Sequence, residues 1–344
     1  MKRLLTVLMA VFMVFLGTVT PTANASSVQR FTINGKKYVR TFYDEFGGTE
    51  LDDSKWEKAP EWGRQNNYCY WDDDMTTLDG KGHLILSADY DDDGNLLTGA
   101  VRSKNRFYQK YGYFEISVKL QKIEGIWSAF WLMPDNIDLG YTGGADGTEI
   151  DIYEAFKVKS KQINHAIHYD GYGSEHKSYG ASVVADVYDG QFHNFALEWD
   201  ETGYTYYIDG KKTYKISPGV EDGTGTPVQV SEIATYLKIS IESGSWTGKP
   251  KAEEVPDNIV VDYVKVYQSE EDYISSHLIY GDLDKNIDVD LKDVKILREY
   301  LAKRTSEISK INANVYSDSK IDTKDVWALR KYISNEINKL PYKE

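Results

Sequence analysis

Three carboxylates lie within one short segment whose other residues suit a buried β-strand. Side chains alternate between the two faces of a strand, so Glu149 and Asp151 share one face. Strict alternation would turn Glu154 to the opposite face. An extra residue at Ile152 or Tyr153, absorbed as a β-bulge, would return Glu154 to the acidic face. The segment therefore predicts three carboxylates on one face of a bulged strand.

The spacing of these carboxylates predicts acid–base chemistry on a glycosidic bond. With one residue absorbed by the bulge, Glu149 and Glu154 lie roughly 13 Å apart along a strand that rises ~3.3 Å per residue. If both side chains lean about 4 Å towards Asp151, their carboxyl groups end ~5 Å apart, as in retaining glycosidases. One glutamate would be the nucleophile and the other the general acid/base, with its pKa raised by neighbouring charge. The alternatives are a solvated acidic face and a structural calcium site, although calcium ligands usually come from irregular loops.

The elements around this segment read as an all-β domain. Residues 30–268 contain short runs of alternating apolar and polar residues, punctuated by Asp-Gly and Gly-Gly turns. We expect residues 29–268 to form an antiparallel β-sandwich of the jelly-roll type. Residues 269–277 are polar and acidic and predict a linker. A small separate module is expected at 278–344.

The N-terminus predicts export. Lys2 and Arg3 precede an apolar run at 4–19, and Ala-Asn-Ala at 23–25 offers a cleavage site, so residues 1–25 read as a signal peptide. A membrane anchor is the alternative, but the run is shorter than the roughly 20 residues that a span needs. Without Lys2 and Arg3 the formal charge falls from −14 to −16. A secreted protein this acidic is expected to bind neither nucleic acid nor an anionic membrane.

The composition favours a neutral sugar as the partner. Tyr occurs 27 times and Trp 8 times, and such rings match both the apolar faces and the hydroxyl rims of sugars. Core packing is the alternative explanation for each of them. Cys69 is the only cysteine, which excludes an intramolecular disulfide and a cysteine-based zinc site. We expect it to be a packed small side chain.

The acidic segment resembles the signature of glycoside hydrolase family 16, in the bulged form of laminarinase-like members. Further matches occur in the family's order at 42–46, 99–104, 111–115, 125–134, 192–199 and 262–267. The resemblance implies a jelly roll with a cleft on its concave face. It also implies that Glu149 is the nucleophile, Asp151 an assisting carboxylate and Glu154 the acid/base. No cofactor is then expected for catalysis.

The resemblance also implies which residues contact sugar. These positions are Asn66, Asn67, Arg102, Trp127, Trp131, His168 and Trp246. We expect a retaining endo-glucanase acting on β-1,3- or mixed β-1,3-1,4-glucan. The segment 239–244 departs from the laminarinase pattern, so xyloglucan and galactan hydrolases stay open. A non-catalytic glycan-binding jelly roll and an adhesion protein are further alternatives, although neither would need the acidic strand.

The C-terminal region is duplicated. Residues 289–300 and 321–332 are identical at seven of twelve positions, and each copy opens a helical pattern with an Asp. Oxygen-bearing residues that lead into the first turn of each copy follow a spacing like that of an EF-hand calcium loop. The first loop offers Asp282, Asp284, Asn286, Asp288, Asp290 and Asp293. The second offers Asn314, Asp318, Asp322 and Asp325.

The two loops are not equivalent. Ile287 replaces the usual Gly of the first loop, and Tyr316 replaces a ligand of the second, which should bind calcium more weakly. No helix is expected before either loop. The duplication resembles a type I dockerin, which implies structural Ca²⁺, a cohesin of a cellulosome scaffold as partner, and recognition pairs at 291–292 and 323–324. The hydrolase resemblance implies a second calcium site at Asp262.

Overall fold

The computed structural model describes residues 28–59, 68–137 and 142–343, and the predicted signal peptide lies outside them. Two compact units result, Gln29–Tyr273 and a second one from Ile274 onward. The division falls a few residues beyond 268, where the alternating pattern of the sequence ends. In the described part of the chain, no helix combines the length and the apolar character needed to cross a bilayer.

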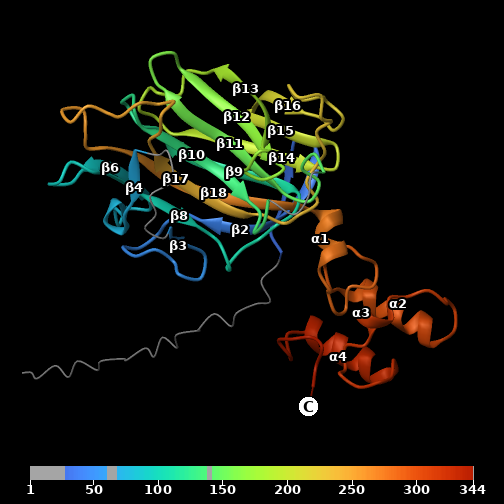
Figure 1. Ribbon diagram of the computed structural model, residues 1–344. Coiled ribbons are helices and arrows are strands. Elements are labelled where there is room, and N and C mark those ends of the chain that lie inside the picture. Colours follow the sequence, from blue (N-terminus) through green and yellow to red (C-terminus); the bar gives the residue numbers. More distant parts are fainter. Residues whose placement is uncertain (1–27, 60–67, 138–141, 344) are drawn as a thin grey trace, which may run out of the picture. The chain divides into compact units, whose positions relative to one another are not determined.

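The first unit is a sandwich of two sheets, drawn as layers in Figure 1. Its larger sheet follows the order β16-β15-β14-β9-β18-β6-β7-β4, with β1, β2 and β5 attached beside this path. The pairings are antiparallel apart from β4 with β7. The strands are β1 (Arg30–Ile33), β2 (Lys36–Asp44), β4 (Cys69–Trp71), β5 (Thr76–Leu78), β6 (Leu84–Tyr90), β7 (Leu96–Thr98), β9 (Gly112–Lys119), β14 (His193–Asp200), β15 (Gly203–Ile208), β16 (Lys211–Ile216) and β18 (Asp257–Ser269).

The smaller sheet carries the acidic segment on its third strand. Its order is β13-β12-β11-β10-β17-β8-β3, and its pairings are antiparallel. The strands are β3 (Glu57–Lys58), β8 (Ala100–Arg102), β10 (Trp127–Met133), β11 (Thr148–Lys157), β12 (Gln162–Tyr169), β13 (Lys177–Val184) and β17 (Tyr236–Glu242). The 3₁₀ turn η1 (Asp73–Met75) precedes β5. The expected all-β jelly roll is confirmed.

The core of the sandwich lies between the inner faces of the two sheets. Phe114 and Ile116 of β9 face it from the larger sheet, and Ile150 and Ile152 of β11 from the smaller one, all fully buried. These residues recur at every second position, which is the period that places one face of each strand in the core. The opposite face of β11 is therefore left for the carboxylates.

The second unit contains short helices packed around a small core, namely α2 (Leu291–Leu301), α3 (Lys310–Ala313) and α4 (Thr323–Ile333). Helix α1 (Glu270–Ser276) spans the division between the units and has no buried residues. Leu297 of α2 and Leu329 of α4 are fully buried in this core. Asp290 and Asp322 form capping boxes at the starts of α2 and α4, so the expected helical copies that open with an Asp are confirmed.

The division between the units falls inside the predicted linker at 269–277, a segment that is largely helix α1. One expectation about this region was wrong, because short helices, α1 and α3, precede the two loops where none was expected. The acidic residues Glu270, Glu271 and Asp272 form the first turn of α1, where they interact favourably with the helix dipole. The Ser269 hydroxyl also accepts a hydrogen bond from the Asp272 N–H, at 3.0 Å. The acidity of this segment is therefore a signal for the start of a helix.

Candidate active site

Strand β11 is bulged at Ile152. On β10, Trp131 pairs with Asp151 and the adjacent Phe130 pairs with Tyr153, so Ile152 has no counterpart in this ladder. The register with β12 shifts over the same interval. Ile152 and Tyr153 both lie in the sandwich core, fully buried. The predicted bulge is confirmed, and it occurs at one of the two residues proposed from the sequence.

The bulge brings the three acidic side chains to the face opposite the core. Glu149 is 8% exposed, Asp151 3% and Glu154 8%. Their cross-strand neighbours on β12 are His168 for Glu149 and Asn164 for Glu154. Carboxylates held this far from water are costly unless they are paired, hydrogen-bonded or protonated.

Glu154 has the environment of a general acid. Burial, followed by the charges of Glu149 and Glu242, raises the pKa of Glu154 to about 7. A hydrogen bond from Asn164 acts in the opposite direction. The Asn164 bond is direct, with Nδ2 donating to Oε2 at 2.6 Å. Glu154 can therefore hold a proton near neutral pH and release it when needed.

Glu149 and Asp151 have different partners. The Tyr172 hydroxyl donates a hydrogen bond to Glu149 Oε2. Asp151 Oδ2 lies 3.5 Å from His168 Nε2, and His168 Nδ1 lies 3.0 Å from His176 Nε2. Tyr172 and His176 belong to the loop between β12 and β13. This loop therefore supplies a direct partner to Glu149 and, through His176, a partner to the His168 ring beside Asp151.

The predicted sugar-contacting tryptophans fall into two environments. Trp127 and Trp246 pack edge to face with ring centroids 5.0 Å apart, and Trp246 is 53% exposed. Trp131 is only 3% exposed, its Nε1 donates to Ser240 Oγ at 3.1 Å, and the Lys238 ammonium lies 3.6 Å from its ring centroid. Trp246 thus offers an open ring face, whereas Trp131 packs within a local cluster.

Arg102 lies in a row of side chains that crosses the sheet from Asp151. The register joins Asp151 to Trp131, Trp131 to Lys238, Lys238 to Arg102 and Arg102 to Glu57. Arg102 Nε lies 2.5 Å from Glu57 Oε1 in an ion pair. The predicted positions Asn66 and Asn67 lie outside the described residues.

Several residues of the site were not predicted from the sequence. They are Asn164, Tyr172, Lys238 and Glu242. Two of them follow a pattern that is visible in the sequence, because Lys238 and Glu242 alternate with the apolar residues of β17. In the structure both are buried. Buried charges on the face opposite a core indicate a built site. Tyr172 lies in a loop, whose path the strand pattern does not predict.

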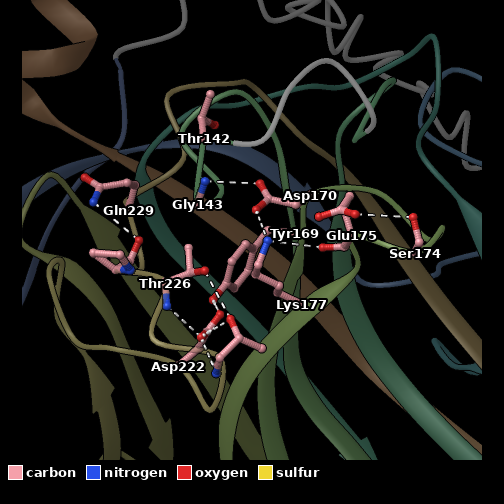
Figure 2. A network of polar contacts seen from close by, with 12 residues as sticks. Thr142, Gly143, Tyr169, Asp170, Ser174, Glu175, Lys177, Asp222, Thr226 and Gln229 are labelled. Carbon is pink, nitrogen blue, oxygen red and sulfur yellow. Dashed lines mark hydrogen bonds and ion pairs between the residues drawn. The ribbon is translucent and has the colours of Figure 1, made fainter.

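A polar network connects the segment before β11 with the end of β12 (Figure 2). The Asp170 side chain is fully buried. Its carboxylate forms an ion pair with the Lys177 ammonium at 3.1 Å and accepts a hydrogen bond from the Gly143 N–H at 3.1 Å. Nearby, the Tyr169 hydroxyl donates to Asp222 at 2.8 Å. Gly143 precedes β11 by a few residues, so the network holds the entry to the strand that carries Glu149.

The calcium ligands predicted in the C-terminal unit fit a cation in the first loop. Carboxylate oxygens of Asp282, Asp284 and Asp293 all lie within 4.8 Å of one another. Burial raises the pKa of Asp282 and of Asp293, and neighbouring carboxylates add to the effect. Ile287 has a φ of 76°, in the left-handed region that favours glycine, as expected from its place in the loop. The donor set suits a hard divalent ion.

The second loop has a weaker donor set. Asn314 Oδ1 is buried without a hydrogen-bond partner, as befits an atom directed at a cation. Lys324 Nζ, however, lies 4.0 Å from Asp318 Oδ2, and the Tyr316 ring occupies a ligand position. In the first unit, Asp262 lies at a register shift in β18 and accepts a 3.4 Å hydrogen bond from Ser117. A calcium ion at Asp262 stays a prediction.

Comparison with known proteins assigns both units. Residues 63–265 match the description of glycosyl hydrolases family 16, and residues 280–334 match that of a type I dockerin domain. A sandwich with an acidic, bulged strand is thus followed by a duplicated loop–helix module. The chain belongs to glycosyl hydrolase family 16 and carries a C-terminal type I dockerin domain, a kind of domain that binds Ca²⁺.

Named relatives agree with this assignment. Over 256 residues the chain is 27% identical to glucan endo-1,3-beta-glucosidase A1 of Niallia circulans, an alignment that covers 66% of this chain but only 37% of that protein. It is 27% identical over 271 residues to a beta-glucanase of Acetivibrio thermocellus, covering 77% and 72% of the two chains. A family 16 enzyme for mixed-linkage glucan from Bacteroides ovatus superposes with a TM-score of 0.54 at 28% identity, covering 65% and 99%.

Proposed function

We propose that this protein is an endo-β-glucanase that hydrolyses β-1,3- or mixed β-1,3-1,4-glucan with retention of configuration. The observation that carries the proposal is the bulge at Ile152, which gathers Glu149, Asp151 and Glu154 on one face of β11. The relatives named as glucanases in Niallia circulans and Acetivibrio thermocellus support the same substrate class.

The two glutamates divide the reaction between them. Glu149 attacks the anomeric carbon while Glu154 donates its proton to the leaving glycosidic oxygen, giving a covalent glycosyl-enzyme. Glu154, now ionised, takes a proton from water, which displaces Glu149 and restores the β-configuration. The pKa of Glu154, about 7, suits a group that is acid in the first step and base in the second.

Neighbouring groups hold the carboxylates in place. Asp151 lies between the glutamates in the strand and faces the His168 ring. Tyr172 orients Glu149 through its hydroxyl. Beside Glu154, Trp127 and the exposed Trp246 form an aromatic corner against which the apolar face of a glucosyl ring can pack. We include Arg102, Trp131, Asn66 and Asn67 in the proposed cleft.

The dockerin domain supports the rest of the proposal. We infer that Ca²⁺ in its loops orders residues 278–344 and that the ordered module binds a cohesin of a scaffold protein. Such an assembly is extracellular, which agrees with a signal peptide at residues 1–25 and with a mature catalytic domain from residue 29 to 268. The enzyme would then act on polysaccharide outside the cell as part of a cellulosome.

A glycan panel with product analysis tests the activity. Laminarin, lichenan, barley β-glucan, xyloglucan and agarose are digested with the full chain and with Glu149→Ala as the matched control. We expect hydrolysis of the first three, and NMR of early products should show the β-anomer first. Glu149→Ala should lose several orders of magnitude in kcat, and azide should rescue it as an α-glycosyl azide. Initial release of the α-anomer, or turnover by Glu149→Ala like that of the parent, would contradict the assignment.

A further inference from the structure

His165 lies directly beneath the bulge of the catalytic strand. In the ladder with β12, Asp151 pairs with Ala166 and Glu154 pairs with Asn164. His165 is therefore the β12 residue opposite the extra residue Ile152. Its neighbours Asn164 and Ala166 flank the carboxylates, whereas the His165 ring points into the sandwich and is fully buried.

The His165 ring connects the bulge to the other sheet. Its Nδ1 lies 2.7 Å from the Ile152 carbonyl oxygen, and its Nε2 lies 3.0 Å from the Thr213 hydroxyl on β16. The ring also stacks on Tyr206 of β15, with centroids 4.7 Å apart and an interplanar angle of 25°. One side chain of the smaller sheet thus contacts two strands of the larger one.

These contacts define the state of the ring. A carbonyl oxygen can only accept, so Nδ1 must carry the proton that bonds to Ile152. Burial lowers the pKa of His165 to about 4, so the ring is neutral at physiological pH and Nε2 is an acceptor. The Thr213 hydroxyl supplies the matching donor at 3.0 Å and shares its proton with the Tyr206 carbonyl oxygen at 3.2 Å. The hydrogen bonds therefore run from Thr213 through His165 to the bulge carbonyl.

A bulge needs such a partner. The extra residue is left out of the ladder, and a buried carbonyl without a donor is unfavourable, so a bulged strand tends to revert to regular pairing unless its odd carbonyl is satisfied. Reversion would have a specific consequence here. A one-residue change of register turns every following side chain to the other face, so Glu154 would leave the acidic face and point into the core.

We propose that His165 is a positioning residue for catalysis, which holds the Ile152 bulge in place and thereby keeps Glu154 on the same face as Glu149. His165 touches neither substrate nor the reacting carboxylates. Its action on Glu154 passes through the backbone of β11. This inference rests on the proposed function, because it assigns His165 a part in that reaction.

The test compares His165→Leu with His165→Asn. Leu fills much of the space but cannot donate, whereas Asn carries an N–H donor close to the position of Nδ1. On lichenan, we expect kcat of His165→Leu to fall about 100-fold with KM changed less than threefold. The alkaline limb of its pH profile should move to higher pH, because a Glu154 side chain turned into the apolar core stays desolvated and loses the Asn164 hydrogen bond that lowers its pKa. His165→Asn should recover kcat to within about tenfold of the parent and restore the pH profile.

Three outcomes would overturn the proposal. A Leu variant with the parent's kcat and pH profile would show that the bulge needs no donor. An Asn variant as impaired as the Leu variant would show that His165 contributes only by packing and not as a hydrogen-bond donor. The third outcome requires no variant: ¹⁵N NMR of the parent protein should show a neutral His165 with its proton on Nδ1. A proton on Nε2 would remove the donor to Ile152, whether or not the Leu variant folds.

A separate measurement distinguishes this inference from the proposed function. The pKa of Glu154 can be followed by ¹³C NMR of labelled carboxyl groups, without any substrate. If the parent cleaves none of the glycans tested, the proposed function fails. His165→Leu should still raise the pKa of Glu154 if the inference about the bulge is correct, and an unchanged pKa would refute it.

Discussion

Asn164 donates a hydrogen bond to Glu154 across 2.6 Å, from the position directly opposite it in the β11–β12 ladder. The amide is itself oriented, since the Ser182 hydroxyl on β13 donates to Asn164 Oδ1 at 3.2 Å. Three neighbouring strands thus contribute to the state of one carboxyl group. Asn164 favours the ionised form of Glu154, whereas burial and the charges of Glu149 and Glu242 favour the protonated form.

Replacing Asn164 by Ala should therefore change the pH dependence in a definite direction. Without this hydrogen bond the pKa of Glu154 rises above about 7, so the acid keeps its proton to higher pH. The alkaline limb of kcat/KM should move upward. The kcat value should fall roughly tenfold or more, because a charge-assisted hydrogen bond contributes about 1.5–3 kcal/mol. Ser182→Ala is the milder control, since it only frees the amide to rotate. A limb that moves downward would show that Glu154 is not the group that titrates.

Glu154→Gln should lose activity and should be more stable than the parent at alkaline pH. The pKa of Glu154 is about 7 in the folded protein and 4.5 for an ordinary glutamate, so the unfolded chain loses this proton first as the pH rises. Stability from this group is complete below about pH 4.5 and is lost as the pH rises through 7. At 1.36 kcal/mol per pKa unit, the cost is at most roughly 3 kcal/mol.

Gln cannot ionise, so Glu154→Gln should be more stable than the parent at pH 8 and similar at pH 4. Urea unfolding followed by tryptophan fluorescence measures the difference. The signal reports mainly on the sandwich, because seven of the eight tryptophans lie between Trp56 and Trp246. An equal gain at both pH values would mean that the stabilisation does not come from the ionisation of Glu154.

Lys177→Met should destabilise the sandwich strongly. It leaves the Asp170 carboxylate, whose side chain is fully buried, without the ammonium that now lies 3.1 Å away. Breaking a buried ion pair from one side costs about 3–5 kcal/mol. The matched control is Lys161→Met, whose ion pair with Asp186 is exposed and contributes at most about 1 kcal/mol. Urea unfolding measures the loss of unfolding free energy in each variant. Equal losses would show that the network of Figure 2 does not stabilise the sandwich.

The sequence predicted the carboxylates and the bulge of β11 but not the side chains that hydrogen-bond to those carboxylates. Three carboxylates and one surplus residue are local features, so the bulge could be placed at Ile152 or Tyr153 without any partner strand. Asn164 and Tyr172 could not be assigned in the same way. Their contacts depend on the register of β11 with β12 and on the path of the loop that follows, neither of which is a local property.

Helix α1 was not predicted, although its sequence carries a local signal. Its acidic start was interpreted by composition alone, although acidic residues behind a Ser are also typical of a helix N-terminus. In the duplicated module, by contrast, the Asp of each copy was correctly expected to open a helix. There the repeat itself gave two independent examples of one signal, and the capping boxes at Asp290 and Asp322 confirm it.

Calcium should affect docking and not hydrolysis. The acidic groups of the first loop repel one another until a cation neutralises them, so calcium should order the second unit. Glu149 and Glu154 need no metal for the proposed reaction. EDTA added to the full chain should therefore abolish cohesin binding while cleavage of soluble lichenan persists. Asp282→Ala and Asp293→Ala should weaken cohesin binding more than Asn314→Ala, because the second loop already has Tyr316 at a ligand position.

Calorimetry and a cohesin pull-down in Ca²⁺ or EDTA measure these effects, with the rate on lichenan recorded in parallel. A modest fall in thermal stability of the sandwich in EDTA would agree with a calcium ion at Asp262, and Asp262→Ala should remove that difference. Loss of hydrolysis in EDTA at a temperature where the sandwich stays folded would contradict the metal-free mechanism. Cohesin binding that ignores both EDTA and Asp282→Ala would contradict the part assigned to the first loop, because its three clustered carboxylates are the strongest donor set in the second unit.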